Sequence, residues 1–172
     1  LRCAVAFFRD VPSLQKINRK IGEELYVKGF VARTGIDDIL GKSRPMIEVK
    51  EKIRRFAGVE AAVLISGETG TGKELVAHAL HRESPRRRMP FVAVNFASLA
   101  PNLIESELFG YEDGAFTWAK RGGKMGLFEM ADQGTLFLDE VGEISHEMQL
   151  RLLRILEARE VMRVGGSRIF SV

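Results

Sequence analysis

The sequence contains very little cysteine, which limits the kinds of protein that it can encode. Its 172 residues include a single cysteine, Cys3, so it has no internal disulfide framework and a reducing compartment is expected. No apolar run approaches the roughly 20 residues that a membrane-spanning helix needs. The first apolar stretch is interrupted by Arg9 and Asp10 too early to act as a signal peptide. We therefore expect a cytoplasmic protein without membrane association.

Several recognisable patterns are also missing from the sequence. There is no zinc-ligand spacing, no RNA-binding aromatic signature, no clear helix-turn-helix, no internal repeat and no low-complexity tract. There is no initiator methionine, so we expect a fragment of a longer protein. A content of 45% hydrophobic and 28% charged residues is typical of a soluble globular domain with its own core.

The net charge of +3 is too small to predict a nucleic-acid partner. The one dense basic cluster is Pro85-Arg86-Arg87-Arg88, which could attract phosphate. Such a cluster is more often a solvated loop, and we favour that interpretation.

The first part of the chain has the pattern of an amphipathic helix. Within residues 11–28, apolar side chains recur at helical spacing with polar residues between them, at Leu14, Ile17, Ile21 and Leu25. Two heptads are too few to indicate a coiled coil, so a helix packed on a neighbour is the simpler interpretation. A connector punctuated by Gly29 and Gly35 follows, and a second helical pattern runs through Met46, Val49 and Ile53.

From residue 61 onward, short apolar runs alternate with helical patterns. The runs predict strands at 61–65, 91–94 and 135–138, with further extended pieces at 161–164 and 168–172. Helices are predicted at 73–82, 104–109 and 127–130, and a long one begins after a cap at Ser145. Continuous apolar strands that alternate with helices indicate an α/β fold with a parallel sheet covered on both faces.

The stretch ISGETGTGKE, residues 65–74, has the pattern of a phosphate-binding loop between a strand and a helix. Its glycines permit backbone angles that turn successive amides toward an anion, and the dipole of the next helix points at the same place. Lys73 can reach the outer phosphates, whereas Glu74 replaces the usual magnesium-holding Ser or Thr. The alternative, a glycine-rich turn without a ligand, fits the lysine poorly. The nucleotide-binding candidates here are Gly67, Glu68, Thr69, Gly70, Thr71, Gly72, Lys73 and Glu74.

A second site is predicted by GTLFLDE, residues 134–140, where a buried strand ends in two carboxylates. Ligands of open α/β sheets collect at the carboxyl ends of the strands. Neighbouring residues of an extended chain point to opposite sides, so the two side chains can have different roles. Asp139 would hold magnesium, and Glu140 would polarise the water that attacks the γ-phosphate. An acidic loop start is the alternative for this motif alone, and the upstream phosphate-binding loop argues against it.

Asn95 also follows a predicted strand, in VAVNFASL. Its amide could hydrogen-bond Glu140 and hold it away from water, or it could simply form a local turn or cap. The residues by themselves favour the local turn.

These motifs together resemble one family. GETGTGKE, VNFASL, ESELFGYEDGAFTWA, GLFEMADQGTLFLDEVGEIS and QLRLLRILEAREVMRVGG are similar to the central AAA+ domain of sigma-54-dependent bacterial transcription activators, over residues 36–172. The resemblance implies a P-loop NTPase of the AAA+ type, a three-layer sandwich with a mostly parallel sheet. Residues 24–40 resemble the linker of propionate-catabolism regulators. We therefore expect residues 1–35 to be a helical linker from a missing sensory domain and residues 36–172 to be a partial AAA+ domain.

The resemblance also implies an activity and partners. Family members form a hexameric ring that hydrolyses ATP with Mg²⁺ to remodel the closed complex of sigma-54 RNA polymerase on the promoter, and they bind DNA only through a C-terminal domain. A loop that contacts the sigma-54 factor corresponds to Gly114, Ala115, Phe116, Thr117, Trp118 and Ala119. The family has glycine where this chain has Trp118, so ATP chemistry should survive while coupling to sigma-54 suffers.

By the same resemblance, Glu74 is usual after the lysine, Asn95 restrains Glu140, and Ile39 and Gly41 join the nucleotide-binding residues. Lys73, Asn95 and Glu140 are then the expected catalytic residues, with Asp139 and Glu140 at the metal.

The resemblance also implies that residues 36–172 contain only part of the family's domain. The family's sensor I, arginine fingers, helical lid and last strand would lie beyond residue 172, which leaves the phosphate-loop strand at a sheet edge, with strand four beginning at Arg168. An arginine finger contributes about 10³–10⁵ in rate. The alternative to an ATPase is therefore a fragment that binds nucleotide without useful turnover or activation.

Overall fold

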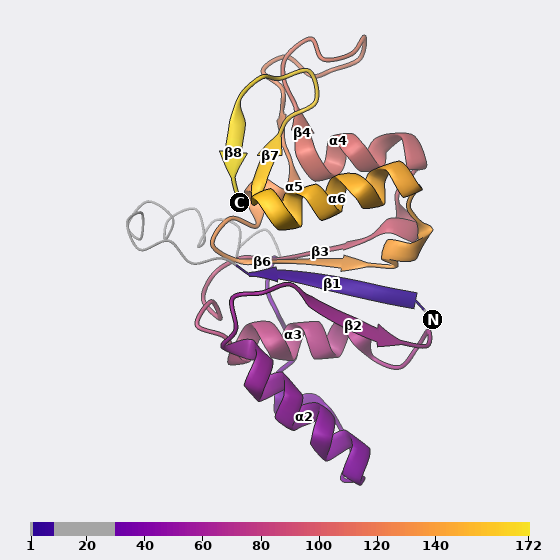
Figure 1. The fold of residues 1–172 in the computed structure, drawn as a ribbon, viewed down its shortest axis with the longest axis vertical. Helices are drawn as coiled ribbons and strands as arrows, with labels where there is room; N and C mark the ends of the chain where they lie inside the picture. Colours follow the sequence, from indigo (N-terminus) through magenta and orange to yellow (C-terminus); the bar gives the residue numbers. More distant parts are fainter. Residues whose placement is uncertain (1, 9–29) are drawn as a thin grey trace.

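The computed structural model describes residues 2–8 and 30–172, and it forms three layers (Figure 1). A sheet lies in the middle, α3 (Lys73–Glu83) covers one face with α2 (Arg44–Ala57) beyond it, and α4–α6 cover the other face. The helix predicted within residues 11–28 lies outside the described residues. No helix in the described part of the chain is long and apolar enough to cross a membrane.

Most predicted elements are present close to their predicted bounds. The strands are β1 (Arg2–Phe8), β2 (Val63–Gly67), β3 (Phe91–Asn95), β4 (Gly110–Tyr111), β5 (Lys124–Met125), β6 (Thr135–Asp139), β7 (Glu160–Met162) and β8 (Ile169–Ser171). The remaining helices are α4 (Ile104–Phe109), α5 (Leu127–Met130) and α6 (His146–Ala158), with short 3₁₀ turns η1 (Ile36–Asp38), η2 (Phe96–Ser98), η3 (Pro101–Leu103) and η4 (Val141–Glu143). As predicted, Ser145 caps α6, because its hydroxyl accepts from the Met148 amide at 3.3 Å.

The central sheet has the strand order β2-β1-β6-β3. Strands β3 and β6 are parallel, and β1 is antiparallel to both of its neighbours, β2 and β6. It follows that β2, β6 and β3 run in the same direction and end at the same edge of the sheet. This edge carries the candidate site, because Gly67, Asp139 and Asn95 are the last residues of these strands.

Two expectations about the sheet are wrong. Arg2–Phe8 belongs to the sheet as β1, not to a helical linker, because this apolar run pairs with β2 on one side and β6 on the other. Ile169–Ser171 does not lie in the central sheet. It pairs with Glu160–Met162 in an antiparallel hairpin, and β1 occupies the place between β2 and β6.

The expected edge position of the phosphate-loop strand is confirmed. Among the described strands, β2 is hydrogen-bonded to β1 alone. The side chain of Leu64 on this strand is 64% exposed, which a strand covered on both faces would not allow.

The two faces of the sheet bury different side chains. Phe91 and Phe137 pack with Ala77 of α3, while Leu136 and Leu138, on the opposite face of β6, pack with the α4–α6 layer. His81 of α3 is also buried and shares a 2.8 Å hydrogen bond with the Thr135 hydroxyl. Burial lowers the pKa of His81 to about 4, so its imidazole stays neutral at neutral pH.

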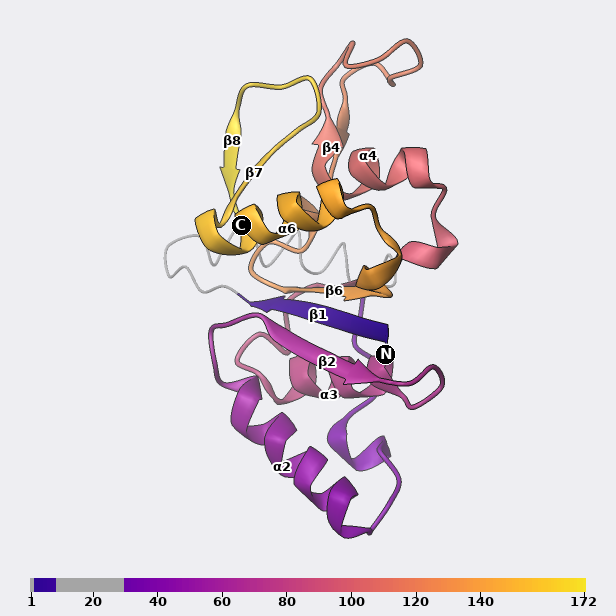
Figure 2. The ribbon, with the colours of Figure 1, turned by 45° about the vertical axis from the view of Figure 1, so that its right-hand side comes forward.

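Two short hairpins project from the α4–α6 side of the molecule (Figure 2). One is β4–β5, which encloses residues 112–123, and the other is β7–β8. They lie side by side, since Val164 donates its amide to Gly110 and accepts from the Glu112 amide, both at 3.0 Å. The hairpins therefore support one another.

Candidate functional site

The predicted phosphate-binding loop has the backbone that anion binding needs. It connects β2 to α3, and Gly70 and Gly72 both have left-handed backbones, with φ of +82° and +85°. Gly72 is the N-cap of α3, so the helix dipole is aimed at this loop. Residues 68–71 are exposed, and the Thr71 amide donates to the Glu68 carbonyl at 3.4 Å, which closes the turn. These features match a phosphate cradle.

Within this loop, side chains stabilise the turn. The Thr71 hydroxyl donates to the Glu68 carbonyl at 2.8 Å, and a Cβ on Gly67 would lie only 2.8 Å from the same hydroxyl. The Lys73 ammonium donates to the carbonyls of Gly67 at 3.3 Å and Glu68 at 2.9 Å. Lys73 is thus held over the loop, where its charge can meet a phosphate.

The two carboxylates lie at the same edge of the sheet. Asp139 ends β6 and is half-buried, while Glu140 is buried and only 9% exposed. Glu140 has a left-handed backbone, with φ of +57°, so the alternation expected for an extended chain stops at Asp139. For a residue other than glycine this backbone costs roughly 1–2 kcal/mol, and such strain is concentrated at functional sites.

Asn95 contacts the first of these carboxylates. Its amide nitrogen donates to Asp139 at 3.2 Å, and its oxygen accepts from the Ala97 amide at 2.9 Å. The sheet register explains the first contact, because Asn95 and Asp139 are direct partners on parallel strands. The contact that we expected was with Glu140, the next residue along the chain. The local turn that we considered is present as well.

One strand separates the phosphate-binding loop from the carboxylates. Because β1 lies between β2 and β6, their ends are about 10 Å apart, twice the usual spacing of neighbouring strands. Arg2 is the register partner of Gly67 at this edge. The cation-bearing loop and the two carboxylates thus lie at the same edge of the sheet, with the first residues of β1 between them.

The two nucleotide-binding candidates that precede α2, Ile39 and Gly41, lie in different environments. Ile39 is buried in a cluster that joins η1, α2 and α3. Gly41 has a φ of +130°, and a Cβ there would lie 2.9 Å from the Met46 side chain. Ile39 is thus a core residue beside α3, and Gly41 permits the turn into α2.

The three arginines of the basic cluster after α3 differ in solvent exposure. Arg87 and Arg88 are exposed, as a solvated loop requires. Arg86 is 8% exposed and lies 3.9 Å from a Glu60 carboxylate oxygen. The interpretation as a solvated loop therefore holds for two of the three arginines.

The loop Gly114–Ala119, which we call the projecting loop, lies at the far end of the β4–β5 hairpin (Figure 2). Phe116 is 42% exposed and packs at 4.9 Å, between ring centroids, against Tyr111 at the base. The Ala119 amide donates to the Phe116 carbonyl at 2.9 Å, which closes a tight turn around Trp118. The Trp118 side chain is 90% exposed, and its backbone lies outside the left-handed region, so this turn does not require glycine there.

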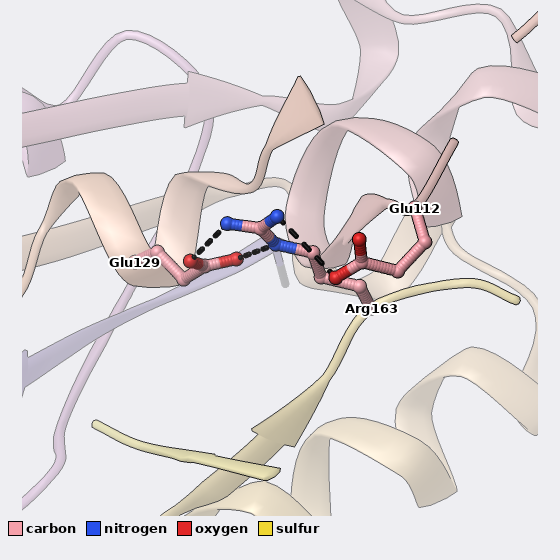
Figure 3. Close-up of polar contacts among 3 residues, drawn as sticks. All are labelled: Glu112, Glu129 and Arg163. Atoms are coloured by element: carbon pink, nitrogen blue, oxygen red, sulfur yellow. Dashed lines mark hydrogen bonds and ion pairs between the residues drawn. The ribbon is translucent and has the colours of Figure 1, made fainter. Parts of the chain in front are cut away.

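A cluster that the sequence analysis missed supports this loop. Arg163 binds Glu129 of α5 through two hydrogen bonds, at 2.7 and 2.8 Å, and reaches Glu112 at 3.4 Å (Figure 3). The hydrogen-bonded Glu129 carboxylate raises the pKa of the Arg163 guanidinium. The cluster joins the β7–β8 hairpin, α5 and the first residue after β4. Its members lie at residues 112, 129 and 163, too far apart for periodicity or a local motif to indicate it.

Comparisons with known proteins identify the family of the chain. The sigma-54 interaction domain family matches residues 39–172. The chain is 46% identical over 168 residues to a signal-transduction and transcriptional-control protein of Clostridium beijerinckii, covering 98% of this chain and 26% of that protein. It is 54% identical over 130 residues to the acetoin dehydrogenase operon transcriptional activator AcoR of Bacillus subtilis, covering 76% and 22%. The chain thus spans about a quarter of the length of these relatives.

A solved structure agrees with the fold. NtrX from Brucella abortus, crystallised in complex with ATP, has a TM-score of 0.69 and 36% identity to this chain, covering 87% of this chain and 31% of NtrX. The fold is that of an AAA+ P-loop NTPase, as the resemblance implied. The chain belongs to the family of sigma-54 interaction domains.

Proposed function

We propose that this chain is the ATP-binding core of a sigma-54-dependent transcription activator, a cytoplasmic protein that uses ATP hydrolysis to remodel the closed complex of sigma-54 RNA polymerase. The observation that carries the proposal is the convergence of the phosphate-binding loop, Asp139 and Glu140 at one edge of the sheet. Catalysis by an ATPase consists mainly of positioning and charge stabilisation, and this edge supplies the groups for both.

The residues at this edge fit a nucleoside triphosphate and a divalent cation. The backbone of the loop at residues 68–72, Lys73 and the start of α3 bind the phosphates. Asp139 and Glu140 would hold Mg²⁺, which would neutralise phosphate charge there. Glu140 accepts a proton from the attacking water. Asn95 acts as a positioning residue through its 3.2 Å hydrogen bond to Asp139.

The proposed nucleotide site is tested by Lys73→Met, which removes the ammonium but keeps the length of the side chain. We expect ATP affinity to fall at least about 50-fold, because a charge-assisted bond to phosphate in a partly closed loop is lost. Titration calorimetry with ATP and Mg²⁺ measures it. Lys42→Met, on an exposed residue before α2, is the control and should bind normally. Equal affinity of the two variants would exclude this loop as the site.

The proposed partner surface is the projecting loop. Phe116 and Trp118 are large exposed aromatic side chains on a hairpin that stands clear of the core, and burial of such side chains dominates many protein interfaces. We propose that this loop contacts the sigma-54 factor within RNA polymerase and that the ATPase works as a homo-oligomeric ring. DNA contact belongs to other parts of the longer protein.

Trp118 is expected to weaken this contact, since an indole enlarges a tip that the family builds with glycine. The variant Trp118→Gly should increase promoter opening by a longer protein containing this domain about fivefold or more, with the ATPase rate changed less than twofold. Its turn does not depend on Trp118, so the fold should persist. Open-complex formation with purified sigma-54 RNA polymerase measures the effect. Equal activation by both proteins would show that Trp118 is harmless.

A second candidate function is nucleotide binding without useful turnover. The exposure of Leu64 and the pairing of β2 favour it, because among the described strands the one that holds the phosphate-binding loop is hydrogen-bonded to β1 alone. Tight ATP binding combined with hydrolysis no faster than that of Lys73→Met would support this candidate over the first.

A further inference from the structure

Residues 30–35, which we call the connector, lie along α3 before they enter η1. The Phe30 carbonyl accepts from the Phe91 amide at 3.1 Å, which fixes one end of the connector to β3. Ala32 is buried with Ala77 and Phe137. The connector is therefore packed on the same helix whose first turn bears the phosphate-binding loop.

Two side chains of α3 hold the backbone of the connector. The Arg33 amide donates to His78 Nδ1 at 3.1 Å, and the Thr34 amide donates to the same atom at 3.4 Å. The Arg82 guanidinium donates to the Arg33 carbonyl at 2.9 Å. His78 and Arg82 are one helical turn apart, so they form a clip that satisfies both backbone polar groups of Arg33.

The clip requires neutral His78 with its proton on Nε2, because Nδ1 can accept only when it carries no hydrogen. Nε2 faces Glu74 at 3.8 Å, and the imidazole ring packs edge-on against Phe91 with centroids 4.5 Å apart. Burial lowers the pKa of His78 and outweighs the opposing effect of Glu74, while Arg33 lowers it further. The acceptor form of the ring is thus the stable one at neutral pH.

The connector also covers the apolar side of α3. Beyond it, Ile36 and Ile39 of the following turn pack with Ala79 and Leu80. An isolated helix of the length of α3, 11 residues, is only marginally stable in water. The clip reaches the first turn of α3 through Glu74, which follows Gly72 and Lys73 and whose carboxylate lies 3.8 Å from His78 Nε2.

We propose that the connector is a regulatory strap that the His78–Arg82 clip fastens to α3, so that releasing it weakens nucleotide binding. The nucleotide half of this inference rests on the proposed function. A displacement of the chain upstream of Phe30 would reach the phosphate-binding loop through α3. The strap thus links the position of residue 30 to the proposed ATP site.

Strap release is tested by trypsin cleavage after Arg33, in two matched variants. His78→Leu removes the acceptor, whereas His78→Asn places its side-chain oxygen close to the position of Nδ1. We expect cleavage at Arg33 to be about fivefold to tenfold faster in His78→Leu and within twofold of the starting protein in His78→Asn. Arg82→Met, at an exposed position, should accelerate it about threefold and serves if His78→Leu does not fold. Cleavage after Arg87, in an exposed loop, is the internal reference and should not change.

The effect of the connector on nucleotide binding is tested in the same variants by titration with a fluorescent ATP analogue and Mg²⁺. We expect affinity to fall about threefold to tenfold in His78→Leu and to be retained in His78→Asn. Cleavage at Arg33 at the starting rate in both His78→Leu and Arg82→Met would overturn the strap, and faster cleavage with unchanged affinity would overturn its control of the site. If the starting protein bound no nucleotide, the proposed function would fail, and the cleavage comparison would still decide whether the clip holds the connector.

Discussion

Replacing Glu140 by glutamine is expected to slow ATP hydrolysis by about 10²–10⁴-fold, because the amide cannot accept a proton from the attacking water. Glutamine has nearly the same shape as glutamate, and it faces the same backbone cost at φ of +57°. The phosphate-binding loop is untouched by the change. Because Glu140 is also a proposed Mg²⁺ ligand, ATP affinity is compared without Mg²⁺, where it should stay within about threefold of the starting value and so separate chemistry from binding.

The measurement is a single turnover of radiolabelled ATP with protein in excess, so that slow product release does not hide the chemical step. Glu143→Gln is a matched control, since it makes the same change at an exposed residue of η4 near the same edge. Its rate should match that of the starting protein. If Glu140→Gln hydrolysed ATP as fast as Glu143→Gln, Glu140 could not be the base.

The local elements of this fold were predictable because they depend on residues close in sequence. The apolar stripe after Ser145 predicted α6, and the glycines around Lys73 predicted the turn between β2 and α3. The predicted end of β2 differed from the observed end by only two residues, because the strand runs to Gly67 instead of stopping at Ile65. Periodicity and turn residues carry this information directly.

The pairing of strands was not predictable in the same way. The partners of β1 are at residues 63–67 and 135–138, so its place depends on contacts between distant segments. We expected this apolar run to belong to a helical linker, because a short apolar run does not show which strands will pair with it. The segment Ile169–Ser171 likewise found its partner in the nearby Glu160–Met162 instead of the central sheet.

At the candidate site, too, local sequence predicted some features, whereas others depend on contacts between distant segments. The positions of Lys73, Asp139 and Glu140 follow from motifs, and the structure brings them to one edge. The partner of Asn95 depends on the register of β3 against β6, which made it Asp139. The left-handed backbone of Glu140 was also hidden, because a positive φ at a residue other than glycine has no sequence signal.

Arg163→Met is expected to lower the free energy of unfolding by about 2–3 kcal/mol, because it leaves the Glu129 carboxylate without its bidentate partner. The Glu129 side chain is only 8% exposed, so water cannot easily replace the guanidinium. Since the Arg163 side chain is itself 18% exposed, we expect less than the roughly 3–5 kcal/mol that breaking a fully buried pair costs. Urea unfolding followed by circular dichroism measures the difference.

A double-mutant cycle separates the lost interaction from the stranded charge. In Arg163→Met with Glu129→Gln, the buried carboxylate is gone, so the double variant should be about 1 kcal/mol more stable than Arg163→Met alone. Glu112→Gln is the control within the same cluster. Its contact is longer, at 3.4 Å, and more exposed, so its cost should stay below about 1 kcal/mol. If the losses of unfolding free energy in Arg163→Met and Glu129→Gln added up to the loss in the double variant, Arg163 and Glu129 would not be coupled.

The same cluster connects stability to function, because Glu112 begins the segment that carries the projecting loop and Val164 is bonded to Gly110 and Glu112. The cluster lies on the α4–α6 side of the sheet, whereas the phosphate-binding loop begins α3 on the other side (Figure 1). At temperatures where Arg163→Met stays folded, its ATP affinity should therefore be unchanged while its binding to the sigma-54 factor falls about tenfold. Loss of both would mean that the variant fails through general unfolding, and loss of neither would show that the projecting loop holds its position without Arg163.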